Sequence, residues 1–198
     1  MSIMLPSTPG IRSAKPRLLD FGGVLTPPLG GASQKLNRLG DRYGLAPEMP
    51  PLRTEPDGRR WVALLSRARR EGAIFAFPQP DLVIGEPGAP VVDGVGQAGM
   101  TLNLLGFAAA YIVREGQFFS IIHGGRRYLH MATADTVADG DGKMALPIEP
   151  MLRISPSNGD VCEFAAPKIE GWLEGQAVEW EHRLEPYTMV TFTITEAE

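Results

Sequence analysis

Glycine and proline interrupt this chain along almost its whole length, and they constrain its fold more than any other feature. There are 23 Gly and 18 Pro among 198 residues, with no fixed spacing between them. Both residues break helices, and their clusters mark turns. Long helices therefore cannot dominate the fold, and collagen is excluded. The shares of hydrophobic (43%) and charged (21%) residues are typical of a globular protein with one or two small domains.

One helix is predicted, from about residue 55 to about residue 71, because apolar residues recur at helical spacing: Trp61, Leu64, Leu65 and Ala68. We expect Thr54 to cap its N-terminus, with Pro56 in the first turn and Asp57 completing a loose capping box. Gly72 is expected to end the helix in a left-handed conformation. We expect the helix to pack on the sheet formed by the last strands.

Short strands are predicted for most of the chain after residue 72, where apolar residues alternate with polar ones or form short runs. Gly124-Gly125 and Asp139-Gly140-Asp141-Gly142 predict the tight turns between some of these strands. About a dozen short strands and a single α-helix indicate a mainly β fold, built as a β-sandwich or a β-barrel.

The first 16 residues contain three prolines and few apolar side chains. We expect them to form an extended arm that becomes ordered against a neighbouring molecule. Short strands of a sheet are predicted to follow at residues 17–21, 33–39 and 42–46.

Charge is distributed unevenly along the chain. The net charge of −4 divides into +5 for residues 1–85 and −9 for residues 86–198. Surfaces of opposite sign can orient association with another copy or a partner, although ordinary solvated faces would give the same numbers. The basic excess lies largely on one helix and is not interleaved with aromatic residues, so sequence-specific DNA binding is not expected.

Cysteine content and hydropathy exclude further classes. The single Cys162 cannot form an internal disulfide and is expected to be a small buried hydrophobic residue. We expect no secretory signal, because no basic region followed by an apolar run opens the sequence. The longest uncharged stretch, residues 94–113, contains four glycines as well as Gln97, Thr101 and Asn103, so a membrane helix is not expected.

Two motifs resemble ligand loops but have simpler explanations. Residues 94–99 spell GxGxxG, yet the following helix and downstream acidic residue of a dinucleotide site are missing, which favours a plain glycine loop. Asp139 and Asp141 lack the twelve-residue calcium loop that ends in glutamate, which favours turn chemistry.

No catalytic constellation is found either. His123 and His130 could approach each other across a hairpin, but a metal site would also require Cys162 or His182 to converge on them, so surface histidines are expected. Ser120 lacks the strained turn and oxyanion hole of a nucleophile. We therefore predict no catalytic residue, no cofactor and no metal site, and we do not expect an enzyme.

The candidate interface residues are three tryptophans and two arginines: Trp61, Trp172, Trp180, Arg59 and Arg60. Tryptophans are more often anchors of a core or an interface than platforms for sugars. The arginines could bind an anionic ligand, and a solvated helix face is the simpler alternative.

A series of short sequence blocks follows one another in a fixed order from about residue 18: Gly30-Gly31 with Gln34 and Arg38, 40–43, 49–52, 61–65, 70–72 with Phe75 and Phe77, 90–99, 114–120, 128–131, 134–142, 146–150, 152–153, and 178–180 with Tyr187 and Phe192. Together they resemble the distal tail protein family of long-tailed, siphovirus-like phages and prophages. Two segments depart from the family: Pro78-Gln79-Pro80 stands where Gly-Asp-Pro is usual, and residues 163–172 match poorly.

The resemblance implies a structural protein of the virion without catalytic activity. Members form a ring at the tail tip that joins the tail tube protein to baseplate hub and fibre proteins, while DNA passes through the lumen without specific binding. It implies a sandwich-like ring domain, residues 1–85 with 167–198, and an inserted OB-like barrel, residues 86–166. A homohexamer would be assembled in the host cytoplasm without membrane insertion and would carry a net charge of −24, which would repel DNA phosphates if acidic residues line the lumen.

Three other functions stay open. The barrel could bind a host-surface glycan through exposed Tyr or Trp side chains. The chain could be a neighbouring tail-tip ring protein of the same fold. A peptidoglycan or polysaccharide hydrolase is the third, and no residue pattern supports it.

Overall fold

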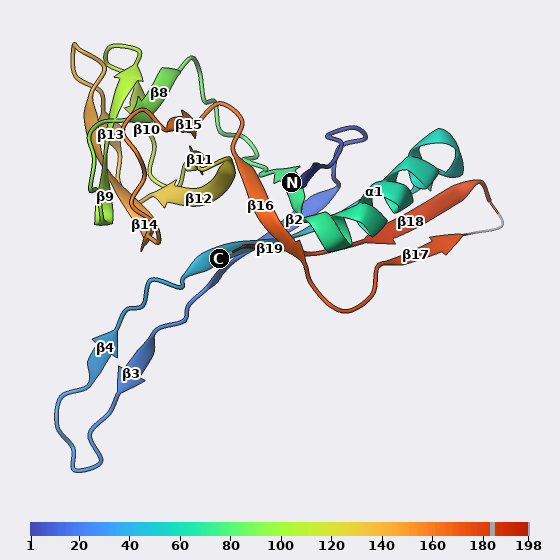
Figure 1. Cartoon of the computed structure of the whole chain (residues 1–198), viewed down its shortest axis with the longest axis horizontal. Coiled ribbons are helices and arrows are strands. Elements are labelled where there is room, and N and C mark those ends of the chain that lie inside the picture. Colours follow the sequence, from blue (N-terminus) through green and yellow to red (C-terminus); the bar gives the residue numbers. More distant parts are fainter. Residues whose placement is uncertain (183–184, 198) are drawn as a thin grey trace.

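Strands account for most of the regular structure in the computed structural model, which describes residues 1–182 and 185–197. The chain has a sheet covered by one helix, a closed barrel beside it, and a hairpin that projects away from both (Figure 1). The predicted mainly β fold with one helix and a small barrel is confirmed.

The sheet has nine strands from both ends of the chain: β1 (Ile3–Met4), β2 (Ser13–Leu19), β5 (Arg42–Glu48), β6 (Leu52–Arg53), β7 (Ala73–Ala76), β16 (Lys168–Leu173), β17 (Glu179–His182), β18 (Tyr187–Thr191) and β19 (Ile194–Glu196). Hydrogen bonds order seven of them as β1-β7-β16-β19-β5-β18-β17, while β2 pairs with β5 and β6 with β18. The alternation predicted for Val190, Phe192 and Ile194 is confirmed, because all three are buried.

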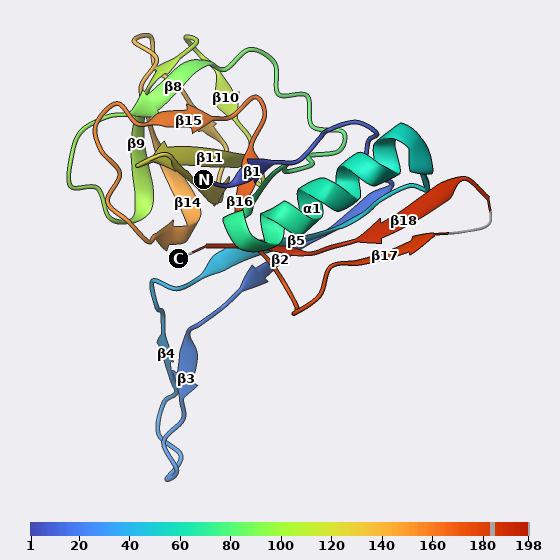
Figure 2. The ribbon, with the colours of Figure 1, turned by 45° about the vertical axis from the view of Figure 1, so that its right-hand side comes forward.

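The helix α1 (Arg59–Glu71) lies across one face of this sheet (Figure 2). Its apolar stripe contributes Trp61, Leu65 and Ala68 to a core shared with the last strands, as predicted. It ends at Gly72, whose φ of 86° is positive and whose N–H donates to the Ala68 carbonyl oxygen at 2.8 Å.

The predicted start of the helix is wrong. A wide turn, η1 (Thr54–Gly58), precedes α1, and Glu55 within it has extended dihedral angles of −120° and 130°. No side chain caps either element. The hydroxyl of Thr54 instead receives a hydrogen bond from Thr188 of β18 at 3.3 Å, so docking against the sheet replaces the expected cap.

The barrel is built from six antiparallel strands in the order β11-β12-β14-β9-β8-β15: β8 (Gly88–Val92), β9 (Gly99–Phe107), β11 (Phe118–His123), β12 (Arg126–Ala132), β14 (Met144–Leu152) and β15 (Val161–Glu163). That is one strand more than the five of an OB-fold. A short pair, β10 (Ile112–Val113) with β13 (Thr136–Val137), lies beside it. Its own apolar core includes Phe119 and Phe164, whose rings stack at 4.4 Å.

The expected tight turns of the barrel are confirmed. Gly124 and Gly125 both have positive φ and join β11 to β12. Asp139 accepts hydrogen bonds from the backbone N–H groups of Asp141 and Lys143, at 2.9 and 2.8 Å. Both segments therefore do what turn chemistry requires of Gly and Asp.

The expectation for the N-terminal arm needs correction. Residues 3–4 form β1, which pairs in parallel with β7, and Leu5 is buried in the core beneath the helix. Residues 13–19 form β2 at the side of β5. The first 19 residues are thus ordered largely by this chain itself, because Ile3 and Leu5 supply enough apolar surface to anchor them.

A buried ion pair joins the barrel to the sheet. The carboxylate of Glu196 in β19 is 2.7 Å from Arg153 and accepts hydrogen bonds from the backbone N–H groups of Tyr43 and Leu129, both at 2.7 Å. Burial raises the pKa of Glu196, while the positive charge of Arg153 and the backbone hydrogen bonds oppose that rise. The last strand therefore connects both parts of the molecule.

Candidate interaction surfaces

Trp61 is not available as an interface residue. Its side chain is 1% exposed and lies between the helix and the sheet, with ring centroids 6.2 Å from Phe75 and 5.8 Å from Phe192. The helical stripe that predicts α1 is the same one that points Trp61 inward. Trp61 therefore belongs to the core, which is one of the two roles expected for it.

Arg59 and Arg60 lie on the exposed side of α1. Arg59 forms an ion pair with Glu55, four residues earlier, at 2.6 Å. Such exposed pairs between residues four apart stabilise a helix by only about 0.3–0.5 kcal/mol. The two arginines are not brought together with any of the tryptophans, and a solvated helix face accounts for them.

Trp172 and Trp180 are both exposed, by 49% and 44%. They lie on different strands, since Trp172 of β16 pairs with Thr195 and Trp180 of β17 pairs with Val190. Trp180 shares a face with buried Val190, on the side of α1, and Trp172 lies on the opposite face. The structure therefore offers two separate aromatic positions.

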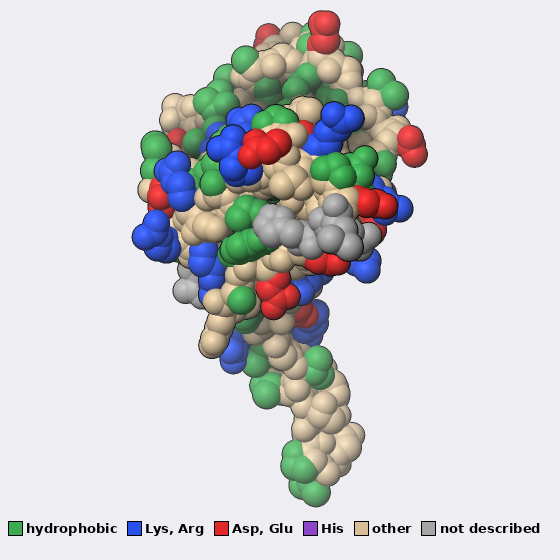
Figure 3. Space-filling model, turned by 90° about the vertical axis from the view of Figure 1, so that its right-hand side faces the viewer, with side chains coloured by type: hydrophobic (Ala, Val, Ile, Leu, Met, Phe, Trp, Pro, Cys, Tyr) green, Lys and Arg blue, Asp and Glu red, His purple; other side chains and the backbone are tan. Residues whose placement is uncertain are grey.

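A projecting hairpin is the most prominent surface feature, and sequence reasoning missed it. The hairpin arm, residues 20–41, contains β3 (Gly23–Leu25) and β4 (Gln34–Leu36), which pair only with each other among the described residues. Six large apolar side chains are exposed along it: Phe21, Val24, Leu25, Leu29, Leu36 and Leu39. Its far end has apolar and uncharged surface only (Figure 3).

A signal for the arm exists in the sequence. Residues 22–34 contain no charged residue, and the pairs Gly22-Gly23, Pro27-Pro28 and Gly30-Gly31 divide them into short turns. Residues 17–21 and 33–39 were expected to be strands of a sheet, whereas β3 and β4 form a separate two-stranded ribbon. An isolated ribbon of this kind is marginally stable in water and commonly needs a partner.

The candidate chemical residues do not converge. His123 lies 2.6 Å from Asp160, whereas His130 is 1% exposed and its Nδ1–H donates to the Pro150 carbonyl oxygen at 2.9 Å. The expectation of two surface histidines is therefore wrong for His130, because its ring fills a place beside Phe119 in the barrel. Ser120 donates to the Glu163 carboxylate at 2.8 Å, so its hydroxyl has a structural partner.

The glycine loop and the cysteine have structural roles. Residues 94–99 connect the antiparallel strands β8 and β9, and the buried Gln97 side chain ties this loop to Asp93 and Asn103. That context differs from a dinucleotide loop, which needs a following helix. Cys162 is 3% exposed, and burial raises the pKa of its thiol, as expected for a small hydrophobic residue.

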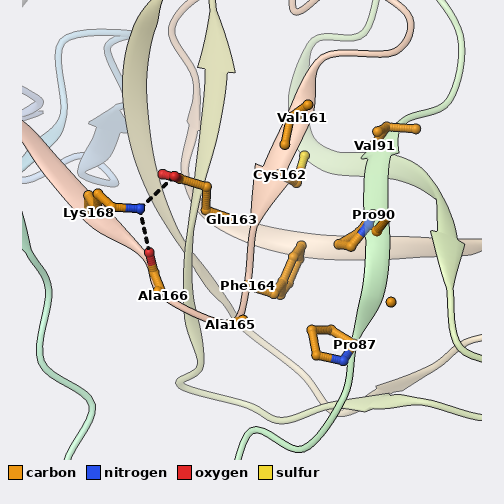
Figure 4. A pocket seen from close by; sticks show the side chains of 12 residues that line it. Pro87, Pro90, Val91, Val161, Cys162, Glu163, Phe164, Ala165, Ala166 and Lys168 are labelled. Atoms are coloured by element: carbon orange, nitrogen blue, oxygen red, sulfur yellow. Dashed lines mark hydrogen bonds and ion pairs between the residues drawn. The ribbon is translucent and has the colours of Figure 1, made fainter.

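A cleft of about 300 Å³ opens between β8 and β15, where the two strands pair only at Val91 and Val161 (Figure 4). Its lining is largely apolar and includes Pro87, Pro90 and Phe164. Lys168 at its side is held by Glu163 and by the Ala166 carbonyl oxygen. The cleft therefore lacks the converging polar groups that fix a small polar ligand.

Within residues 1–182 and 185–197, no group of three His, Cys, Asp or Glu side chains is placed to hold a metal ion. None of the described helices has the length and hydropathy that crossing a bilayer requires. The potential roles of His182 lie outside what the structure describes of side chains.

Comparison with known proteins adds no relative: no protein-family model matches the chain, and no curated protein matches it.

Proposed function

We propose that this chain is a structural protein of a phage tail tip, of the distal tail type, which assembles with copies of itself into a ring. The hairpin arm carries the proposal. It exposes six large apolar side chains on a two-stranded ribbon, and that surface is unfavourable for a chain that stays alone in water. The ordered sequence blocks that resemble the distal tail family support the same function.

The proposed partners follow from this resemblance. One side of the ring would contact the tail tube protein, and the other side the baseplate hub and fibre proteins. The nine-stranded sheet with α1 would form the ring, and the barrel would project from it. DNA would pass through the lumen without specific binding. The protein would be located at the tail tip of the virion after assembly in the host cytoplasm, and a neighbouring tail-tip ring protein would use the same surfaces.

Negative-stain microscopy and light scattering of the purified chain test the proposal. We expect closed rings at high protein concentration, or after addition of the tail tube protein from the same phage or prophage. A monomer that persists at high concentration and with that tube protein would refute the proposed function.

One observation favours a second candidate, a glycan-binding module of the tail tip. Trp172 lines a cleft of about 380 Å³ together with Arg126, Glu170 and the Gly124-Gly125 turn. An exposed tryptophan beside polar groups is a common platform for a sugar ring. The site lies where the sheet meets the barrel, and Trp172 belongs to β16, not to the barrel where the glycan site was expected.

A glycan array distinguishes this candidate. Binding that is lost in Trp172→Ala and kept in Trp180→Ala would support a sugar site at the cleft. No signal on the array and on host cells would contradict it. Clearing of host cell walls in a zymogram would instead indicate a hydrolase, which we do not expect.

A further inference from the structure

Two strands of the sheet have a free side. The order β2, β5, β18, β17 is fixed by successive antiparallel pairings, which include Ser13 with Glu48, Glu48 with Thr191, and Thr191 with Glu179. Among the described residues, β2 pairs only with β5, and β17 only with β18. The two free edges therefore lie on opposite sides of this part of the sheet.

The free edges carry opposite charge. Lys15 and Arg17 lie on β2, with Arg12 just before it. Glu179 and Glu181 lie on β17. Lys15 and Glu179 are exposed, and neither forms an ion pair within the described part of the chain.

Opposite charges also share a face. The pairing from Ser13 through Glu48 and Thr191 to Glu179 places these residues in one row. Side chains two residues apart on a strand point the same way, so Lys15 and Arg17 share the face of Glu179 and Glu181. This is the face opposite α1, because the neighbouring residue Val190 is buried on the helix side.

The other face of both edges is apolar. Between the charged residues of β2 lie Ala14, Pro16 and Leu18, and Leu18 is 44% exposed. On β17 the corresponding position is Trp180, which is also 44% exposed. When two edges meet, acidic side chains would thus oppose basic ones on one face, and Trp180 would cover apolar side chains on the other.

We propose that β17 of one copy docks along β2 of a second copy of this chain. β2 and β17 run in opposite directions within one sheet, since three antiparallel pairings separate them, so the new pair is antiparallel. The contact is heterologous, joining two different surfaces, and repetition of such a contact gives a ring when the rotation closes. This inference rests on the proposed ring and names the surfaces that build it.

The same charges select the partner. Two β2 edges repel each other through Lys15 and Arg17, and two β17 edges through Glu179 and Glu181, which disfavours a symmetric dimer through like edges. Pro16 has no N–H to donate, which limits backbone pairing at the centre of β2. We therefore assign most of the specificity to the side chains.

A charge exchange tests the contact in the full-length protein. Lys15→Glu and Glu179→Lys are each expected to weaken self-association about tenfold or more, because each places like charges opposite each other. The double variant exchanges the two signs and is expected to recover most of the loss. Asp141→Lys, in an exposed turn of the barrel, is the matched control and should leave association unchanged. Sedimentation at several concentrations measures the effect, and unchanged thermal unfolding shows that each variant folds.

Carbodiimide cross-linking of mixed normal and ¹⁵N-labelled protein tests the contact directly. We expect intermolecular links between Lys15 and Glu179 or Glu181. Rings that form without these links, and that tolerate both single reversals, would overturn the edge contact and leave the ring function intact. A chain that never assembles, with or without its tube protein, would overturn both.

Discussion

At the scale of single residues, the last strand matters most for stability, because it carries the carboxylate that both parts of the molecule bind. Glu196 is 2% exposed, and its partner Arg153 is nearly as buried. Removing one partner of such a pair leaves an uncompensated charge away from water, which is far more costly than losing an exposed pair.

Arg153→Met is therefore expected to lower the free energy of unfolding by about 3–5 kcal/mol. Arg114→Met is the control, since Arg114 pairs with Asp135 on the surface at 3.3 Å and should cost less than about 1 kcal/mol. Urea unfolding of both variants measures the difference. Equal losses would mean that the Glu196 pair does not join barrel and sheet.

His130 predicts a dependence of stability on pH. Burial is the main cause that lowers its pKa to about 4, and the nearby positive charge of Arg153 adds to it. The unfolded chain binds a proton near pH 6.5 while the folded chain does not, so this contribution is complete above that pH and is lost as the pH falls toward 4. The loss is about 3 kcal/mol at the acidic end.

The comparison with His130→Gln isolates this contribution from other titrating groups. We expect the stability of the original protein to fall more steeply than that of the variant between pH 6.5 and 4, measured by urea unfolding at each pH. Parallel pH profiles would show that His130 becomes protonated without cost to the fold.

Local residue patterns were readable from sequence, and distant partners were not. The stripe of Trp61 and Leu65 and the turn glycines at 124 and 125 act through neighbours within a few positions, so their roles were predicted. Glu196 depends on residues 43, 129 and 153, which only the tertiary fold brings together. Thr54 failed as a cap for the same reason, because its partner is residue 188.

At the scale of elements, strands were easier to predict than their neighbours. Alternation reports that a segment is extended, but it does not report what lies beside it. The arm was thus expected to be part of a sheet, and β1 was expected to need another molecule. Its two strands are in fact a separate ribbon, and β1 pairs with β7 of its own chain.

The arm is expected to contribute to assembly and little to folding. Replacing residues 24–35 by Asn-Gly, which joins the paired residues Gly23 and Leu36, should shift the melting temperature by less than about 4 °C. The deleted side chains are exposed, so no core is lost. Self-association measured by light scattering should fall. The pair Leu25→Ser with Leu29→Ser keeps the arm and is expected to reproduce the loss. A large drop in melting temperature, or unchanged assembly, would contradict this role.

At the scale of the whole molecule, the barrel strands all come from residues 88–163, and the sheet strands from the segments before and after them. Such an arrangement leaves the sheet edges β2 and β17 free of the barrel's own strands and gives the chain two surfaces of opposite charge. Together with the projecting arm, these surfaces support the account of a protein whose structure is completed by copies of itself.

Native mass spectrometry of the purified full-length chain, with and without its tube protein, measures that central claim most directly. The account predicts a closed assembly, which for a hexamer is about 128 kDa, six times the 21.4 kDa chain. A single species of 21.4 kDa at every concentration and with the tube protein present would contradict it.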